Sequence, residues 1–229
     1  NVTDGNSCAP ASALSVSDDF AINALPDVST LTIVADDICV GDDGNVTITT
    51  SLADGTYDFT YDLAAPNAAT DLTASVTVAG GSATMTIPAA SLSNTTASQT
   101  VTITNVTDGN SCAPASALSV SDAFAINALP DVSTLTIVAD DICVGDDGNV
   151  TITTSLVDGT YDFTYDLAAP NAATDLTASV TVAGGSATMT IPAASLSNTT
   201  ASQTVTITNV TDGNSCAPAS ALSVSDAFA

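Results

Sequence analysis

The stretch Gly55-Thr-Tyr-Asp-Phe-Thr-Tyr61 is the strongest indication of how this chain folds. Successive side chains of an extended strand point to opposite faces, so Tyr57, Phe59 and Tyr61 share one face and polar residues share the other. Three aromatic side chains on one strand face usually bury, and we therefore predict that they form the centre of a hydrophobic core. A platform that stacks on sugars is the alternative interpretation.

The same stretch returns at 159–165, because the whole chain is a repeat. The string Asn-Val-Thr-Asp-Gly-Asn-Ser-Cys begins at Asn1, Asn105 and Asn209, which sets a period of 104 residues. A unit of this length can bury a core of its own, and it is too long to be one unit of a thin solenoid. The sequence therefore predicts independent modules in tandem.

We place the modules at 25–128 and 129–229, and we interpret residues 1–24 as the C-terminal tail of a preceding module. The joint between the modules, at 122–131, is short and apolar and is rich in neither Gly nor Ser. Such a joint should pack rather than flex, so we expect a stiff rod. Two aligned pairs differ between the copies: Asp19 against Ala123, and Ala53 against Val157.

Short alternating stretches surround the aromatic strand in each module, and turn residues separate them. Gly80-Gly81 can supply the positive φ that a tight turn needs, which predicts a β-hairpin between 72–78 and 83–87. About seven short strands with this patterning are typical of an antiparallel β-sandwich. The other predicted strands of the first module are 29–35, 45–52, 99–104 and 117–124.

The amino-acid composition limits both the fold classes and the partners that the chain can have. The chain has no Lys, Arg, His or Glu, and all 25 acidic residues are Asp. Strong helix formers are therefore missing, whereas the abundant Thr, Val and Ile favour strands, so we predict an all-β fold. A net charge of −25 excludes nucleic acid as a natural partner and disfavours anionic membranes.

The same composition argues against catalysis. Without His, the chain can build no Ser-His-Asp triad, no Cys-His pair and no His-containing zinc site. Asp58 and Asp62 share a strand face, as a glycosidase pair would, but nothing in the sequence suggests a pocket around them. We expect that the chain is not an enzyme. The longest apolar runs are also far too short to span a membrane.

Five cysteines follow the repeat, and paired cysteines in a β-module indicate an oxidising, extracellular setting. We favour disulfides within each module, Cys39 with Cys112 and Cys143 with Cys216, which leaves Cys8 to a partner outside the fragment. Several strands separate the two cysteines of a module, which could place them at opposite poles. A bridge between neighbouring modules, such as Cys39 with Cys216, therefore stays open, as do free thiols.

Acidic residues crowd two loop regions of each module. Carboxylate oxygens are ligands that suit Ca²⁺, so these loops are candidate calcium sites. Solvated turns stabilised by Asp side chains are the alternative. The candidate residues are Asp36, Asp37, Asp42, Asp43 and Asp108 in the first module, and Asp140, Asp141, Asp146, Asp147 and Asp212 in the second.

Three stretches resemble a known family. Cys39-Val-Gly-Asp-Asp-Gly-Asn-Val-Thr-Ile48, Gly55-Thr-Tyr-Asp-Phe-Thr-Tyr61 and Val101-Thr-Ile-Thr-Asn-Val-Thr-Asp-Gly-Asn-Ser-Cys112 are similar to segments of the SprB-type Ig-like repeats of giant gliding adhesins of Bacteroidetes. The resemblance implies tandem Ig-like sandwiches, secretion to the cell surface, and a long stalk for adhesion or motility. The chain departs from the pattern at Ser111, where the family has Gly, and it lacks the family's Trp.

These observations favour a structural repeat of an extracellular filament or adhesin stalk, whose partners are neighbouring repeats of the same chain. The alternative is a β-sandwich module that binds glycans or another surface such as ice, because Thr-rich strands could offer a regular face. Lateral self-assembly into a filament through edge strands or bridges between modules is a further hypothesis.

Overall fold

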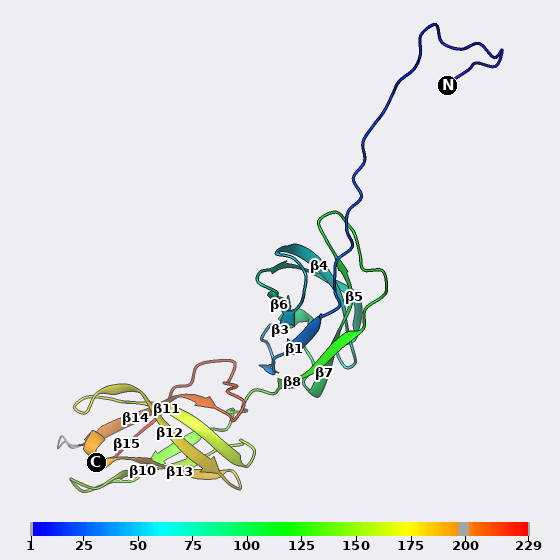
Figure 1. The fold of residues 1–229 in the computed structure, drawn as a ribbon. Helices are drawn as coiled ribbons and strands as arrows, with labels where there is room; N and C mark the ends of the chain where they lie inside the picture. Colours follow the sequence, from blue (N-terminus) through cyan, green and yellow to red (C-terminus); the bar gives the residue numbers. More distant parts are fainter. Residues whose placement is uncertain (1, 197–201, 229) are drawn as a thin grey trace.

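The computed structural model describes residues 2–196 and 202–228, and these residues are almost entirely strands and loops. Two β-sandwiches follow an extended N-terminal segment, which is drawn in blue in Figure 1. The predicted all-β fold with tandem sandwiches is confirmed. No helix among the described residues is long and apolar enough to cross a membrane.

The first module has a sheet of three strands and a sheet of five. Neighbouring strands are antiparallel, except that β2 runs parallel to β8. The smaller sheet has the order β1 (Thr32–Ala35), β3 (Gly44–Thr49) and β6 (Ser82–Ile87). The larger has the order β2 (Ile38–Cys39), β8 (Val120–Asn127), β7 (Thr96–Thr107), β4 (Gly55–Leu63) and β5 (Ala69–Val78). A 3-10 turn, η1 (Ala89–Ser91), follows β6.

The second module repeats this arrangement with one strand fewer. Its sheets have the order β13 (Ser186–Ile191), β10 (Gly148–Thr153), β9 (Thr136–Ala139) and the order β12 (Ala173–Val182), β11 (Gly159–Leu167), β14 (Gln203–Thr211), β15 (Val224–Phe228). The 3-10 turn η2 spans Ala193–Leu196. Within the described residues, no strand of this module corresponds to β2.

The aromatic stretch forms the centre of each core. Phe59 is fully buried and Tyr61 is 3% exposed, which confirms the core prediction for both residues. Tyr57 is half-buried near the start of β4, where its hydroxyl donates a hydrogen bond to the Ala53 carbonyl at 3.1 Å. The buried residues form two separate clusters, one for each module, so each sandwich packs around its own centre.

The predicted hairpin at Gly80-Gly81 is only partly correct. Both glycines have positive φ, at 58° and 78°, and Ala79 and Ser82 exchange two backbone hydrogen bonds across them. The strands on either side do not form a ladder, however, because β5 pairs with β4 and β6 pairs with β3. Val78 and Met85 are both buried in the same core, and the turn carries the chain from one sheet to the other.

A buried polar cluster ties two loops to strand β7, and no pattern in the sequence indicates it. Gln99 is fully buried, and its amide donates hydrogen bonds to the carbonyls of Ala64 and Thr100. Its side-chain oxygen accepts a hydrogen bond from Asn67 at 3.0 Å, while the oxygen of Asn67 accepts two from Asn94. Because buried polar groups are costly when unpaired, this satisfied network fixes the loops in one arrangement.

One Asp of each module joins the two sheets. The Asp122 carboxylate on β8 accepts the N–H of Ala35 on β1 at 2.9 Å, and Asp226 on β15 accepts the N–H of Ala139 on β9 at 2.9 Å. The backbone N–H of Ala139, and to a smaller extent that of Ala227, donates a hydrogen bond to Asp226. These two bonds hold the pKa of Asp226 below its ordinary value. The carboxylate therefore stabilises the fold in its charged form.

We expect the replacement Asp226→Asn to make the stability of the second module less sensitive to acid. The folded pKa lies below the unfolded value of about 3.9, so the contact contributes fully above that pH and is lost as the pH falls through the folded pKa. Melting temperatures of wild type and Asp226→Asn, measured from neutral into acidic buffer, should therefore converge at low pH.

Asp18→Asn is the matched control, because Asp18 is the repeat equivalent of Asp226 in the extended segment outside both sheets. Protonation also relieves the repulsion among the other carboxylates, and this comparison cancels that general effect. A constant difference between Asp226→Asn and wild type at every pH would contradict the assignment.

Candidate functional site

The residues that could carry a function gather where the two modules meet. Cys39 ends β2, and it lies opposite Asn127 at the end of β8. The N–H of Val40 donates to the carbonyl of Asn127 at 2.9 Å, and the chain then turns through Gly41, whose φ is 98°. Cys39 is thus held at the pole where the first module passes into the joint.

Cys216 lies in a tight loop after β14 of the second module. The Asp212 carboxylate accepts the N–H groups of Asn214 and Cys216, both at 2.9 Å, and the N–H of Asp212 donates to the Cys216 carbonyl at 3.1 Å. Ser215 has a φ of 64°, in the left-handed region that favours Gly. The loop is closed on itself by these bonds, and it presents a cysteine whose side chain is fully buried.

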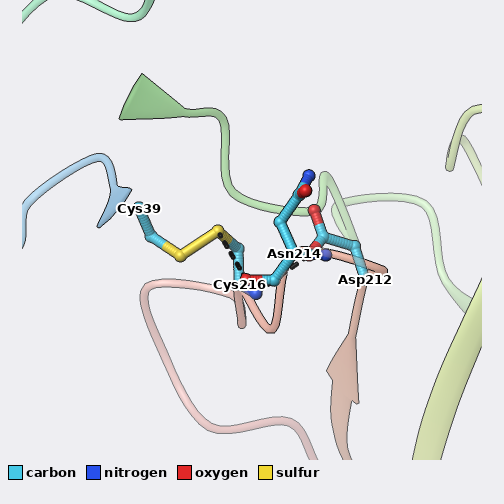
Figure 2. Close-up of a disulfide and its surroundings, with 4 residues drawn as sticks. All are labelled: Cys39, Asp212, Asn214 and Cys216. Carbon is cyan, nitrogen blue, oxygen red and sulfur yellow. Dashed lines mark hydrogen bonds between the residues drawn. A yellow bond between two sulfur atoms is a disulfide. The ribbon is translucent and has the colours of Figure 1, made fainter. Parts of the chain in front are cut away.

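A disulfide joins Cys39 to Cys216 and so links the first module to the second (Figure 2). The two Cα atoms are 5.6 Å apart, and the bridge spans 177 residues of sequence. The favoured pairing of Cys39 with Cys112, and of Cys143 with Cys216, is therefore wrong. The observed bridge, Cys39 with Cys216, is instead the alternative in which a disulfide joins neighbouring modules.

The strand layout explains why the cysteines of one module do not pair. Cys39 lies beside the last residue of β8, whereas Cys112 lies in the loop before its first residue. β8 has eight residues and is therefore about 26 Å long. A disulfide needs a Cα separation of roughly 4.4–6.8 Å, so the two poles of a module are too far apart.

The other three cysteines are free in this structure: Cys8 and Cys143 are exposed, and Cys112 is partly buried. The loops of Cys8 and Cys112 nevertheless have the geometry of the bonded loop. Asp4 and Asp108 each accept the N–H of the cysteine four residues on, at 2.9 Å and 2.8 Å. The loop is thus formed by local hydrogen bonds and does not depend on the disulfide.

The joint itself is packed against the second module. Leu129 and Pro130 line a hollow together with Leu156 and Tyr161. Partial desolvation raises the pKa of Tyr161, and the nearby charges of Asp212 and Asp158 add to that shift. Leu129 also lines a groove beside the disulfide, with residues of both modules. The structure therefore places apolar linker residues against the second module and beside the disulfide.

Half of the ten acidic candidates accept hydrogen bonds from backbone N–H groups. Asp37 accepts the N–H of Ala125 at 2.6 Å and Asp43 that of Ala89 at 2.7 Å, while Asp147 repeats the second contact in the other module. Asp62 similarly accepts the N–H of Asp71, at 2.8 Å. In the part of the chain that the structure describes, no three acidic or cysteine side chains are grouped to hold a metal ion. The calcium prediction gains no support from this geometry.

The comparisons with known proteins concern the fold. No family model and no curated protein matches the sequence. The FN1–FN3 domains of chicken CNTN1 share 9% identity with it over 88% of this chain and 67% of theirs, with a TM-score of 0.45. A three-Ig segment of titin shares 12% identity over 90% of this chain and 66% of its own, with a TM-score of 0.37.

These are Ig-like β-sandwich modules. Alpha-2-macroglobulin from Escherichia coli also matches, with 11% identity, a TM-score of 0.32 and coverage of 91% of this chain. This chain spans only 16% of that protein. At such low identity the likeness concerns the architecture alone, and the two-sheet topology of each module is what defines the class.

Proposed function

We propose that the chain is a structural segment of an extracellular stalk or filament at the cell surface, of the kind formed by SprB-type adhesin repeats, and that it is not an enzyme. The observation that carries the proposal is the disulfide from Cys39 to Cys216, which ties one module to the next. Because a packed linker also joins the modules, two connections resist bending at the joint.

Further features support a spacer. Of the aromatic residues that could have stacked on sugars, Phe59 and Tyr61 are buried in the core and Tyr57 is half-buried against it. The charge of −25, with no Lys or Arg, makes neighbouring chains repel each other and keeps an extended array soluble. Disulfides persist in oxidising compartments, which fits a secreted protein.

We expect the disulfide to restrict the joint measurably. In small-angle X-ray scattering, the oxidised chain should fit a single arrangement of its modules, whereas the Cys39→Ser variant should need a broad ensemble with a larger maximum dimension. Cys143→Ser is the matched control, because it removes an identical residue that makes no bond. Equal flexibility in all three proteins would refute the spacer proposal.

A second candidate function, binding to glycans or another regular surface, rests on one face of the smaller sheet. Thr47 lies opposite Thr84, and Asn45 opposite Thr86, with all four side chains exposed. Outward Thr is also ordinary strand chemistry. A glycan array probed with the chain should show no retention if the spacer proposal holds. Retention that Thr47→Lys abolishes would favour the binding module instead.

A further inference from the structure

Five Asn-x-Thr motifs lie among the described residues, and they begin at Asn45, Asn94, Asn105, Asn149 and Asn209. A motif of this form is the acceptor of N-linked glycans when it lies at the surface of a secreted protein. The motif by itself does not rank the five sites. The structure does, because the five Asn side chains lie in three different environments.

Asn45 and Asn149 are the accessible acceptors. Each lies on the central strand of the smaller sheet, β3 in the first module and β10 in the second, and each side chain is exposed. Residues two apart in a strand point to the same face, so Thr47 and Thr151, which complete the two motifs, are exposed beside them. The hydroxyl of Thr190 donates a hydrogen bond to the side-chain oxygen of Asn149 at 3.2 Å. The amide nitrogen, which takes the sugar, is therefore directed away from Thr190.

The other three acceptors are obstructed. The side-chain nitrogen of Asn94 donates to the oxygen of Asn67 at 2.9 Å, so it faces the buried polar cluster around Gln99. A sugar on that nitrogen would crowd the cluster. Asn105 and Asn209 are half-buried on β7 and β14, each between two neighbouring strands of the larger sheet. Of the five acceptors, the two on the smaller sheet therefore have the most open space around the Asn side chain.

The outer face of the smaller sheet also lacks the charge found on the larger sheet. Strands β1, β3 and β6 contain no Asp, and neither do β9, β10 and β13. The larger sheet of the first module carries Asp58, Asp62 and Asp71. On the uncharged face, Val34 and Val138 are 59% and 58% exposed. Repulsion between carboxylates thus protects this face least, although each module exposes an apolar side chain on it.

We propose that Asn45 and Asn149 carry N-linked glycans, which cover this uncharged face. The inference rests on the proposed secretion of the chain, because such glycans are added to exported proteins. Each exposed valine lies opposite the Thr that completes the motif of its module, so it is a close neighbour of the sugar. The glycans shield these valines from other chains, and they keep the modules soluble where the surface has no charge.

The reaction is a glycosyl transfer to the amide nitrogen. The donor is an oligosaccharide linked through a diphosphate to a polyprenyl lipid. The side-chain nitrogen of the Asn attacks the anomeric carbon of the first sugar, so that a C–N bond forms and the C–O bond to the diphosphate breaks. The nitrogen gives one proton to a base of the transferase, and the lipid diphosphate leaves. Because the transfer takes place on the unfolded chain during export, the central position of β3 and β10 does not prevent it.

The test expresses the full chain behind a secretion signal in cultured eukaryotic cells. A protease that cleaves before Asp releases residues 43–53 and 147–157, and these peptides differ in mass because Ala53 is replaced by Val157 in the second copy. Release of the glycans from the peptides in heavy-oxygen water then converts each occupied Asn to a labelled Asp. Peptides are taken from the secreted chain and from the chain still inside the secretory pathway, so poor secretion does not hide the result.

Both peptides should carry the label, at Asn45 and at Asn149. Asn105 and Asn209, located by fragmentation of their own peptides, should carry none. A chain without label at Asn45 and Asn149, or one labelled at Asn105 and Asn209 instead, would overturn the inference. Neither result affects the spacer proposal, which the scattering comparison of the oxidised chain with Cys39→Ser tests separately.

Three variants show that the label depends on the motif. Thr47→Val removes the hydroxyl and keeps a β-branched side chain at an exposed strand position, so it should abolish the label at Asn45 and leave that at Asn149. Thr47→Ser should keep the label at Asn45, because Ser also completes the motif. Thr49→Val is the matched control, since it changes the same face of β3 outside the motif, and it should leave both labels in place.

Discussion

Reduction of the Cys39–Cys216 bond is expected to release about 600 Å of additional chain when the protein is pulled from its two ends, since the bridge spans 177 residues. In the oxidised protein, tension passes from residue 39 through the sulfur atoms to residue 216. Only the segments outside that span carry force, and among the strands these are β1, β2 and β15. The remaining strands of both cores are shielded.

Single-molecule force spectroscopy can measure this difference directly. Without reductant, the wild-type chain should show a short final extension, and with reductant it should show two unfolding events and the full extension. The Cys39→Ser variant should behave as the reduced protein in either buffer, whereas Cys112→Ser should behave as wild type. An oxidised chain that extends as far as the reduced one would show that the bridge does not form.

Replacement of Phe59 by Ala is expected to destabilise the first module by about 3–5 kcal/mol, the cost of removing a fully buried Phe. A domain of this size has a total stability of about 5–15 kcal/mol, so the loss is a large part of it. The second module keeps its own Phe163 in a separate core. Denaturant unfolding should therefore split into two transitions, of which only one moves to lower denaturant.

The repeat supplies unusually good controls for this experiment. Phe163→Ala should produce the same split from the other module, and the double variant should shift both transitions. Val157→Ala replaces a residue that is 78% exposed by the one that the first module has at that position, so we expect a change below about 0.5 kcal/mol. A single transition at the wild-type midpoint for Phe59→Ala would contradict the independence of the cores.

Much of the fold could be predicted because it follows from local patterns. The alternation around Phe59 placed the core, and every strand predicted in the first module overlaps one that forms. The pairing of the strands could not be predicted in the same way. The prediction of a tight turn at Gly80-Gly81 is confirmed. The partners of β5 and β6, however, depend on the surface that each strand buries, and only the assembled core determines that surface.

The candidate site was harder to predict, for a physical reason. Sequence gives the number and spacing of cysteines, but a disulfide depends on a distance of a few ångströms in the folded chain. The two-residue strand β2 holds Cys39 at the pole beside Asn127, and it is too short to produce a periodic pattern. The alternatives for Cys39 could therefore be named from the sequence, but the choice between them needed the strand order.

The length of the bridge relative to the repeat has one more consequence. A cut by a protease anywhere between Cys39 and Cys216 leaves both fragments attached, because the sulfur atoms still connect them. The span of 177 residues exceeds the period of 104, so in an array where every joint carries this bond, consecutive loops overlap. Every peptide bond between the first and the last bridged cysteine then lies inside at least one loop. Such an array is a ladder in topology, and no single backbone break can sever it.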